Sequence, residues 1–143
     1  MMKLTQSEDL AGITLLLATE KLCYDDLTPE HMAHFLTLRD GGELIGAVGL
    51  EVIGSDALLR SLVVAPSRRG KGLGIQLVEG IEAHAHDIGV TSLYLLTTTA
   101  DRFFDRHGYE RIERASVPDA IGATTEFVSF CTESAVCMMR NLG

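Results

Sequence analysis

Leu59–Ile75 reads Leu-Arg-Ser-Leu-Val-Val-Ala-Pro-Ser-Arg-Arg-Gly-Lys-Gly-Leu-Gly-Ile, and this stretch decides the fold. It opens on a nearly continuous apolar run, which is typical of a strand buried on both faces. Pro66 ends the strand, because proline has no N–H to give to a neighbouring strand. Alternating glycines follow, and the apolar residues after them recur at helical spacing. The stretch therefore predicts a buried strand, a glycine-rich turn and a helix, in that order.

The glycine-rich turn predicts an anion site. Backbone N–H groups in the first turn of a helix lack partners and carry the positive end of the helix dipole. The glycines between residues 70 and 74 let a large anion approach the main chain closely, and Arg68, Arg69 and Lys71 lie in the same turn. We therefore expect a phosphate ligand there, and a diphosphate suits a loop of this length.

Two common phosphate loops do not fit these residues. A P-loop needs Lys and then Ser or Thr around its last glycine, and Ile75 stands where the Lys is required. The dinucleotide fingerprint needs a third glycine, and Leu73 or Ile75 occupies that position, depending on the starting glycine. The phosphate ligand must therefore belong to another class.

The pattern that does fit is Arg69-x-x-Gly72-x-Gly74. It resembles the acyl-CoA pyrophosphate loop of the GNAT superfamily of N-acetyltransferases, Gln/Arg-x-x-Gly-x-Gly/Ala, and a Leu-Val-Val-x-Pro strand precedes it as in that family. The resemblance implies acetyl-CoA as co-substrate and one domain over residues 1–143. It also implies a mixed α/β sheet of six or seven strands, flanked by helices and splayed between the fourth and fifth strands to admit the pantetheine arm.

The rest of the chain predicts alternating strands and helices, as a mixed α/β sheet requires. A two-residue turn at 54–55 would pair Glu51 with Leu58. Residues 118–130 indicate only a short helix and a loop. The other expected elements are an edge strand at the N-terminus, a helix over 7–20 with a Thr5–Glu8 capping box, a short helix from Thr28, strands over 34–39 and 43–53, a helix that Gly89 ends, a strand over 92–96, a helix over 100–106 capped by Thr99, and strands over 109–114 and 135–142.

The resemblance also implies roles for single residues. Strand backbone groups would bind the acetyl carbonyl and the pantetheine, loop N–H groups would bind the pyrophosphate, and Thr97 stands where many relatives have a pantetheine-binding asparagine. The residues implied to contact acetyl-CoA are Leu62, Val63, Val64, Arg69, Gly70, Lys71, Gly72, Leu73, Gly74, Thr97 and Phe104.

The chain departs from the family at the usual general acid. Phe103-Phe104-Asp-Arg-His-Gly-Tyr matches the segment Leu-Tyr-Glu-Lys-x-Gly-Phe, so Phe104 replaces the tyrosine that protonates the leaving thiolate. A phenyl ring cannot donate a proton, so another donor or water serves, or protonation is not limiting. Tyr109 occupies the structural aromatic position, and we expect it in the core.

A general base is also required, because an ammonium must lose a proton before it attacks a thioester. Some relatives use a glutamate early in the fourth strand, and that position here is Leu58. Glu51, opposite Leu58 on the neighbouring strand, is our candidate base. The competing interpretation is a solvated carboxylate at the end of a sheet.

A closer resemblance concerns the substrate. Leu-Leu-Arg-Ser-Leu-Val-Val, Leu-Tyr-Leu-Leu-Thr-Thr-Thr-Ala and Ser-Ala-Val-Cys-Met resemble the second branch of the arsenic-resistance (ArsN-type) N-acetyltransferases. The first branch of these enzymes acetylates arsinothricin and phosphinothricin, so the resemblance implies a small, amino-acid-like amine of that kind. Arg60, on the same strand face as Leu58 and Leu62 by simple alternation, is a candidate anchor for the carboxylate or phosphinate. The competing interpretation of Arg60 is an ion pair within the protein.

Composition narrows the partners. A net charge of −8 disfavours nucleic acid, the apolar runs are too short to span a bilayer, and no secretory signal is visible. Three cysteines fit a reducing compartment, so we expect a cytoplasmic protein. The pairs His31/His34 and Glu82/His86 lack the further ligands of a zinc site, so we expect no metal, and the resemblance allows a homodimer. Two rival functions stay open: a non-catalytic acyl-CoA sensor, suggested by Phe104 and Leu58, and a thiol-based metalloid-binding protein, suggested by Cys23, Cys131 and Cys137.

Overall fold

The computed structural model describes residues 2–6, 9–22, 24, 26–130 and 135–143. In this described part, seven strands form one open sheet in the order β1-β2-β3-β4-β5-β7-β6, which confirms the predicted mixed sheet. β4 and β5 are parallel and the other neighbours are antiparallel. The strands are β1 (Met2–Gln6), β2 (Phe35–Asp40), β3 (Glu43–Ile53), β4 (Asp56–Val64), β5 (Ser92–Thr97), β6 (Glu110–Ile112) and β7 (Val136–Asn141).

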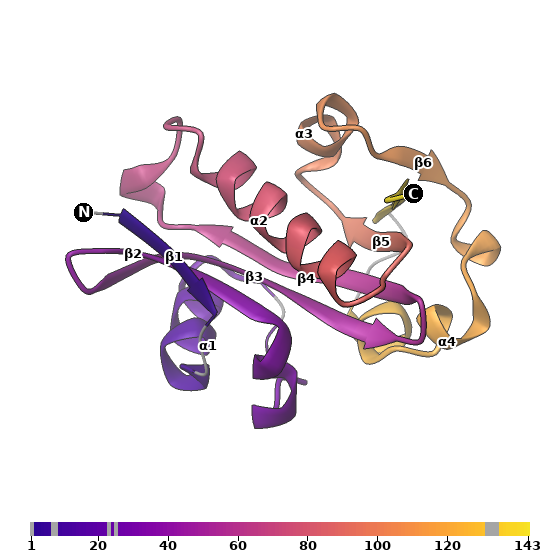
Figure 1. Cartoon of the computed structure of the whole chain (residues 1–143), viewed down its shortest axis with the longest axis horizontal. Helices are drawn as coiled ribbons and strands as arrows, with labels where there is room; N and C mark the ends of the chain where they lie inside the picture. The colour runs from indigo at the N-terminus through magenta and orange to yellow at the C-terminus, as the bar shows by residue number, and fades with distance from the viewer. Residues whose placement is uncertain (1, 7–8, 23, 25, 131–134) are drawn as a thin grey trace.

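Helices cover both faces of the sheet (Figure 1). The long helix α2 packs on one face, where it buries an aliphatic stripe against β2, β3 and β4. α1 covers one end of the other face and α4 the opposite end. The helical segments are α1 (Leu10–Thr19), η1 (Pro29–His34), η2 (Pro66–Arg68), α2 (Leu73–Asp87), α3 (Asp101–Arg106), η3 (Arg114–Ser116), α4 (Asp119–Gly122) and the π turn η4 (Glu126–Phe130).

The β3–β4 hairpin has the predicted register, with Glu51 opposite Leu58. Further along, β4 carries a bulge: Arg60 lies opposite Gly49 but Val63 lies opposite Ala47, so β4 has one residue more than β3 between these pairs. The bulge contains Ser61, whose φ of 61° is in the left-handed region. A non-glycine residue in that region marks a place where the surrounding structure enforces an unfavourable backbone.

The bulge corrects one prediction about Arg60. Simple alternation puts Arg60 and Leu62 on the same face, but the extra residue turns Leu62 to the face covered by α2, with Leu59. Leu58 packs in the cluster with α4 on the other face. Arg60 therefore shares its face with Leu58 and not with Leu62, because one inserted residue reverses the alternation.

The sheet splays between β4 and β5, as expected. The two strands pair only where Asp56, Ala57 and Leu58 face residues 92–94. β4 runs on to Val64 without a β5 partner. The divergence leaves a gap in the sheet whose walls are the unpaired parts of the two strands.

Two predicted helix caps are wrong. Thr5 belongs to β1 rather than to a capping box, and Asp9 caps α1 by accepting a hydrogen bond from the Gly12 N–H at 3.0 Å. Glu8 lies outside the described residues. α3 has Ala100 at its cap position, with no side-chain cap from Thr99. Pairing of β1 with β2 takes Thr5 out of the helix, since a long-range ladder outweighs a local capping motif.

Among the described residues, no helix combines the length and the apolar character needed to cross a membrane.

Candidate active site

A cavity of about 300 Å³ fills the gap between the diverging strands. The unpaired part of β4 forms one wall, and β5 with the loop after it forms another. α3 and the π turn η4 contribute side chains, and so does the chain after α1. The lining residues are Lys21, Leu22, Leu59, Arg60, Ser61, Leu62, Leu95, Leu96, Thr97, Thr98, Thr99, Ala100, Phe104, Glu126 and Ala135.

The glycine-rich turn leads into α2 with its backbone accessible. Gly70 and Gly72 have φ of 79° and 76°, and a Cβ at either position would meet nothing within 4 Å. Within the described part of the chain no side-chain cap is found at Gly72, the N-cap of α2, so the first N–H groups of this helix suit an anion, and Lys71 is exposed beside them. Phe103 of α3 lies 3.5 Å from the Cβ position of Gly74, which links this turn to the helix that lines the cavity. These features fit a pyrophosphate at the turn and a pantetheine arm in the strand gap.

Both arginines of the turn are ion-paired within the protein. Arg68 lies 2.6 Å from Asp40 and 3.0 Å from Glu43, at the β2–β3 hairpin. Arg69 lies 2.5 Å from Glu20 at the end of α1, and its side chain is 57% exposed. Arg69 is therefore the arginine better placed to reach a ligand in solvent.

The β4 residues expected at the acyl group differ in where their side chains lie. Leu62 lines the cavity, whereas Val63 is buried in the cluster under α1. Val64 packs with the α2 cluster, as does Leu73 at the start of that helix. The bulge at Ser61 interrupts the β3–β4 ladder just before these residues.

Thr97 and Phe104 both line the cavity. The Thr97 hydroxyl accepts the Ala100 N–H at 2.9 Å. Phe104 is buried, with its ring 5.1 Å from the ring of Tyr109. Tyr109 is in the core, as predicted, and its hydroxyl donates to Glu82 at 2.8 Å. Burial and the Glu82 carboxylate raise the pKa of Tyr109, so this phenol is a poor acid, and it is not among the residues that line the cavity.

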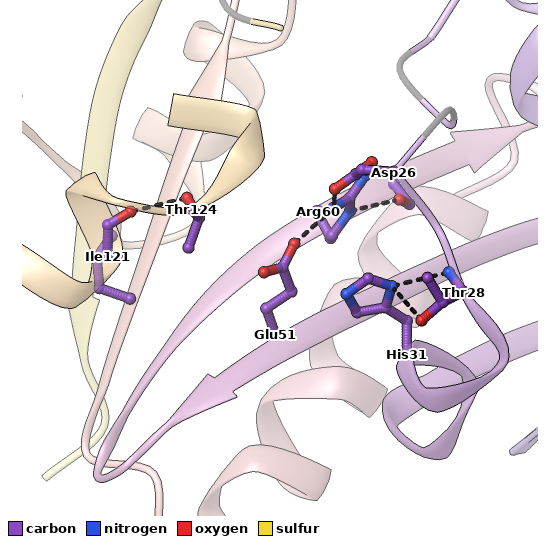
Figure 2. A network of polar contacts seen from close by, with 8 residues as sticks. Asp26, Thr28, His31, Glu51, Arg60, Ile121 and Thr124 are labelled. Atoms are coloured by element: carbon purple, nitrogen blue, oxygen red, sulfur yellow. Dashed lines mark hydrogen bonds and ion pairs between the residues drawn. The ribbon is translucent and has the colours of Figure 1, made fainter. Parts of the chain in front are cut away.

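Arg60 is the centre of a buried ion cluster (Figure 2). Its side chain is 0% exposed. The guanidinium donates to both carboxylate oxygens of Asp26, with Nη2 2.6 Å from Oδ1. It also donates to Glu51 Oε1 at 2.6 Å and to Ser61 Oγ at 3.2 Å. All three nitrogens of Arg60 therefore have partners inside the protein.

The proton affinities of this cluster favour its charged form. Burial alone would raise the pKa of Asp26, but the hydrogen bonds and charge of Arg60 outweigh it and hold that pKa below its usual value. Burial likewise disfavours the Arg60 cation, but Asp26, Glu126 and Glu51 together raise its pKa. Arg60 and Asp26 thus favour each other's charged form.

Glu126 of η4 lies in the field of this cluster and lines the cavity. Its Oε2 atom is buried and has no hydrogen-bond partner among the described residues. Burial raises the pKa of Glu126 to about 7, and the charges of Asp26 and Glu51 add to that increase while Arg60 opposes it. A carboxyl group with this pKa can exchange a proton near neutral pH.

Residues 31–111 match a known protein family. The family model of the acetyltransferase (GNAT) domain matches residues 31–111, which is more than half of the chain. The chain belongs to the GNAT acetyltransferase family.

Curated relatives of this GNAT domain are acetyltransferases by name. An uncharacterised N-acetyltransferase of Chlorobaculum tepidum is 36% identical over 93 residues, 64% of this chain and 59% of that protein. An amino-acid acetyltransferase of Mycobacterium tuberculosis is 32% identical over 77 residues, 53% of this chain and 44% of that protein. An amino-acid acetyltransferase of Ralstonia nicotianae is 26% identical over 95 residues, 65% of this chain and 21% of that protein. The chain therefore spans less than two thirds of the length of each.

Solved structures share the whole fold of the GNAT domain. N-acetylglutamate synthase from Neisseria gonorrhoeae, complexed with coenzyme A and N-acetyl-glutamate, has a TM-score of 0.85 at 21% identity, over 100% of this chain and 35% of that chain. Rv2747 from Mycobacterium tuberculosis, in complex with CoA and NLQ, has a TM-score of 0.81 at 22% identity, over 97% of this chain and 98% of that chain. At these identities the likeness establishes the fold.

Two acidic residues at Arg60, namely Asp26 and Glu126, were not predicted from the sequence. Asp26 was hidden in an acidic pair before a helix start, and Glu126 stands among Phe127, Val128 and Phe130. A lone carboxylate within an aromatic and aliphatic segment is a usable signal, since acids rarely occur in buried segments without a partner or a function. No sequence pattern, however, indicates that Asp26 and Glu126 meet at Arg60.

No group of three or more histidine, cysteine or acidic side chains arranged to hold a metal occurs within the described ranges. Cys137 is a buried free thiol, and burial raises its pKa. Cys23 and Cys131 lie outside the described residues. His31, shown near the cluster in Figure 2, accepts the Thr28 N–H through Nδ1 at 3.0 Å.

Proposed function

We propose that the protein is an acetyl-CoA-dependent N-acetyltransferase that acts on a small amine. The proposal rests on the position of α3, which lies beside both the glycine turn and the cavity between β4 and β5. A Cβ at Gly74 of the glycine turn would lie 3.5 Å from the Phe103 ring, and Phe104 lines the cavity between β4 and β5. A ligand with a diphosphate at one end and a thioester at the other requires such a pair of sites.

In this proposal, the turn from Arg69 to Gly74 binds the pyrophosphate through backbone N–H groups. Leu62, Val63 and Val64 offer the backbone of β4 to the acetyl carbonyl and the pantetheine, an oxyanion-hole arrangement in which donors are fixed before the reaction. Acetyl-CoA supplies the acyl carbon and a thiolate leaving group. Alkyl thiols have a pKa of about 8.5, so a thiolate can leave without a strong acid at the position of Phe104.

The amine substrate is proposed to be amino-acid-like. The curated relatives named amino-acid acetyltransferases support this class, as does the neighbour complexed with N-acetyl-glutamate. The narrower proposal, an arsinothricin- or phosphinothricin-like substrate in arsenic resistance, rests on the sequence resemblance alone. Arg60 as the anchor of the substrate anion would have to exchange a bond to Asp26 or Glu51. Lys21 is a second cation in the same cavity lining.

The alternative function is an acyl-CoA sensor without turnover. Phe104 and Leu58 at the positions of the usual acid and base favour it, because both are buried side chains that cannot transfer protons. A thiol-based metalloid site is a further alternative, and replacing all three cysteines by serine without loss of function would exclude it. Cytoplasmic location, a homodimer and a single domain over residues 1–143 accompany the main proposal and need their own tests.

The test is a thiol-release assay with acetyl-CoA and a panel of amines, namely phosphinothricin, free amino acids, polyamines and peptide N-termini. Release with one class of amine establishes the transferase and identifies the class of substrate. If no amine of the panel causes thiol release while acetyl-CoA still raises the melting temperature, the result supports the acyl-CoA sensor. The absence of any thermal shift would contradict the acyl-CoA site itself.

A further inference from the structure

Glu126, at the start of η4, is an acidic residue in the lining of the cavity. Among the described residues that line the cavity, it is the one acidic side chain, and its Oε2 atom is buried without a hydrogen-bond partner. Buried polar atoms in folded proteins are nearly always paired, so an unpaired carboxylate oxygen on a residue that lines a ligand-sized cavity calls for an explanation. A substrate group that donates a hydrogen bond provides one.

The backbone around Glu126 is held firmly in place. Arg114 donates to the Phe127 carbonyl at 3.0 Å, and its guanidinium lies over the Phe127 ring. The Val128 N–H donates to the Thr124 carbonyl at 3.0 Å, and the Thr124 hydroxyl donates to the Ile121 carbonyl at 2.7 Å (Figure 2). The residues on both sides of Glu126 are therefore hydrogen-bonded, while its carboxylate has an unpaired oxygen among the described residues.

The carboxylates of Asp26, Glu51 and Glu126 differ in whether their oxygens already have hydrogen-bond partners. Asp26 is bound to Arg60 through both oxygens, and Glu51 through Oε1. Glu126 feels the charges of these three groups and has no hydrogen bond to any of them at Oε2. A carboxylate whose oxygens are already satisfied by a guanidinium accepts a proton from a substrate less readily than one with a free oxygen.

Resting on the proposed transferase function, we propose that Glu126 is the general base: its carboxylate receives the substrate ammonium in the cavity and removes one proton from it. The freed amine nitrogen then forms a bond to the acetyl carbon while the carbon–sulfur bond breaks. The second proton on nitrogen goes to the departing sulfur, which leaves as CoA thiol, and Glu126 returns its proton to solvent. Glu51, Asp26 and Arg60 act as positioning residues that fix the charge around Glu126.

The first test needs no substrate. The carboxyl carbons of ¹³C-glutamate-labelled protein are titrated by NMR, and Glu126→Gln identifies the resonance by its loss. Glu126 is expected to titrate near the value of about 7 that its burial gives it, and addition of a substrate amine should shift its resonance. Titration near 4.5, the value of an ordinary glutamate, would overturn the assignment.

The second test is the pH profile of kcat/KM with the amine that releases most thiol. Wild-type kcat/KM is expected to fall tenfold per pH unit below about 7. Glu126→Gln should lower it roughly 10²- to 10⁴-fold and move the plateau to the amine's own pKa, because only amine already deprotonated in solution then reacts. Glu126→Asp should restore part of the rate. Glu51→Gln should keep an acid limb, displaced to lower pH because the Glu51 charge no longer raises the pKa of Glu126.

The two tests distinguish failure of the transferase function from failure of the base role of Glu126. A wild-type protein that releases no thiol with any amine contradicts the transferase function, and the base role with it. A wild-type protein that turns over, while Glu126→Gln keeps both the rate and the limb, contradicts only the base role. Loss of the limb in Glu51→Gln instead would transfer the role to Glu51.

Discussion

The glycine turn and the Arg60 cluster are built in opposite ways. The turn consists of six consecutive residues, from Arg69 to Gly74, of which the first four are exposed, and we propose that it binds through its backbone N–H groups. The cluster brings together side chains from the loop before η1, from β3, from β4 and from η4, and buries the cation at its centre. A backbone site tolerates change in most of its side chains, whereas a buried charge cluster fails when one member is lost, because the remaining charges then have no partner.

Arg60→Met should have the largest effect on stability. It leaves Asp26 and Glu51 buried without their cation, and breaking a buried pair in this way costs about 3–5 kcal/mol of the free energy of unfolding. The measurement is denaturant unfolding followed by circular dichroism. Arg111→Met is the matched control, because Arg111 also binds two carboxylates, Asp101 and Asp105, but is 49% exposed. Equal losses in both variants would mean that the Arg60 cluster is no more costly to break than a surface network.

Glu126→Gln should change how stability depends on pH. The pKa of Glu126 in the folded protein, about 7, lies above its ordinary value of 4.5, so the folded state binds the proton more tightly. This group therefore stabilises the fold fully below about pH 4.5, and the contribution is lost as the pH rises to about 7. At 1.4 kcal/mol per pH unit, the wild type should lose about 3 kcal/mol relative to Glu126→Gln across that window.

The measurement is the free energy of unfolding of both proteins at about pH 5 and about pH 8. The variant should gain relative stability at the higher pH while it loses activity, which is the behaviour of a residue kept for function at a cost in stability. A constant difference between the two proteins at both pH values would contradict a raised pKa.

Gly72→Val should damage the turn with a smaller effect on folding. A side chain in the left-handed region costs about 1–2 kcal/mol, and here it would also cover the N–H groups that we propose bind the pyrophosphate. We expect the thermal shift by acetyl-CoA to disappear. Gly54→Val is the matched control: Gly54 has φ of 63° and equally open space, but lies in the β3–β4 turn. A shift retained in Gly72→Val, or lost in both variants, would argue against the pyrophosphate site.

Arg68→Ala should have the smallest effect. Arg68 is partly exposed and pairs with Asp40 and Glu43, so its bonds are screened by salt. We expect a slight fall in melting temperature at low ionic strength that vanishes in high salt, with acetyl-CoA binding preserved. A large loss that is independent of salt would place Arg68 among the structural ion pairs, together with Arg60.

Much of the fold could be predicted from the sequence because its signals are local. The apolar run ending at Pro66, the glycines of the turn and the two-residue hairpin at 54–55 each act within a few residues. They correctly predicted β4, the start of α2 and the pairing of Glu51 with Leu58. The core position of Tyr109 also followed from its place in a segment of known pattern.

The bulge in β4 marks where local reasoning failed. Alternation predicts that Arg60 and Leu62 share a face of the sheet, but the extra residue at Ser61 places Leu62 on the opposite face. The sequence Arg-Ser-Leu contains no pattern that indicates a bulge. The capping motif at Thr5 failed for a similar reason, since pairing of β1 with the distant β2 decided that segment.

By itself, the sequence determined the class of fold, the order of the elements and the backbone turn that suits a diphosphate, because these depend on neighbours along the chain. Only the tertiary structure decided that Arg60 meets Asp26 and Glu51, and that Glu126 has a free buried oxygen in the same cavity. The physical reason is that burial, and with it the cost of an unpaired charge, is a property of the folded surroundings. A carboxylate acquires a proton affinity near neutral pH only when distant segments close around it.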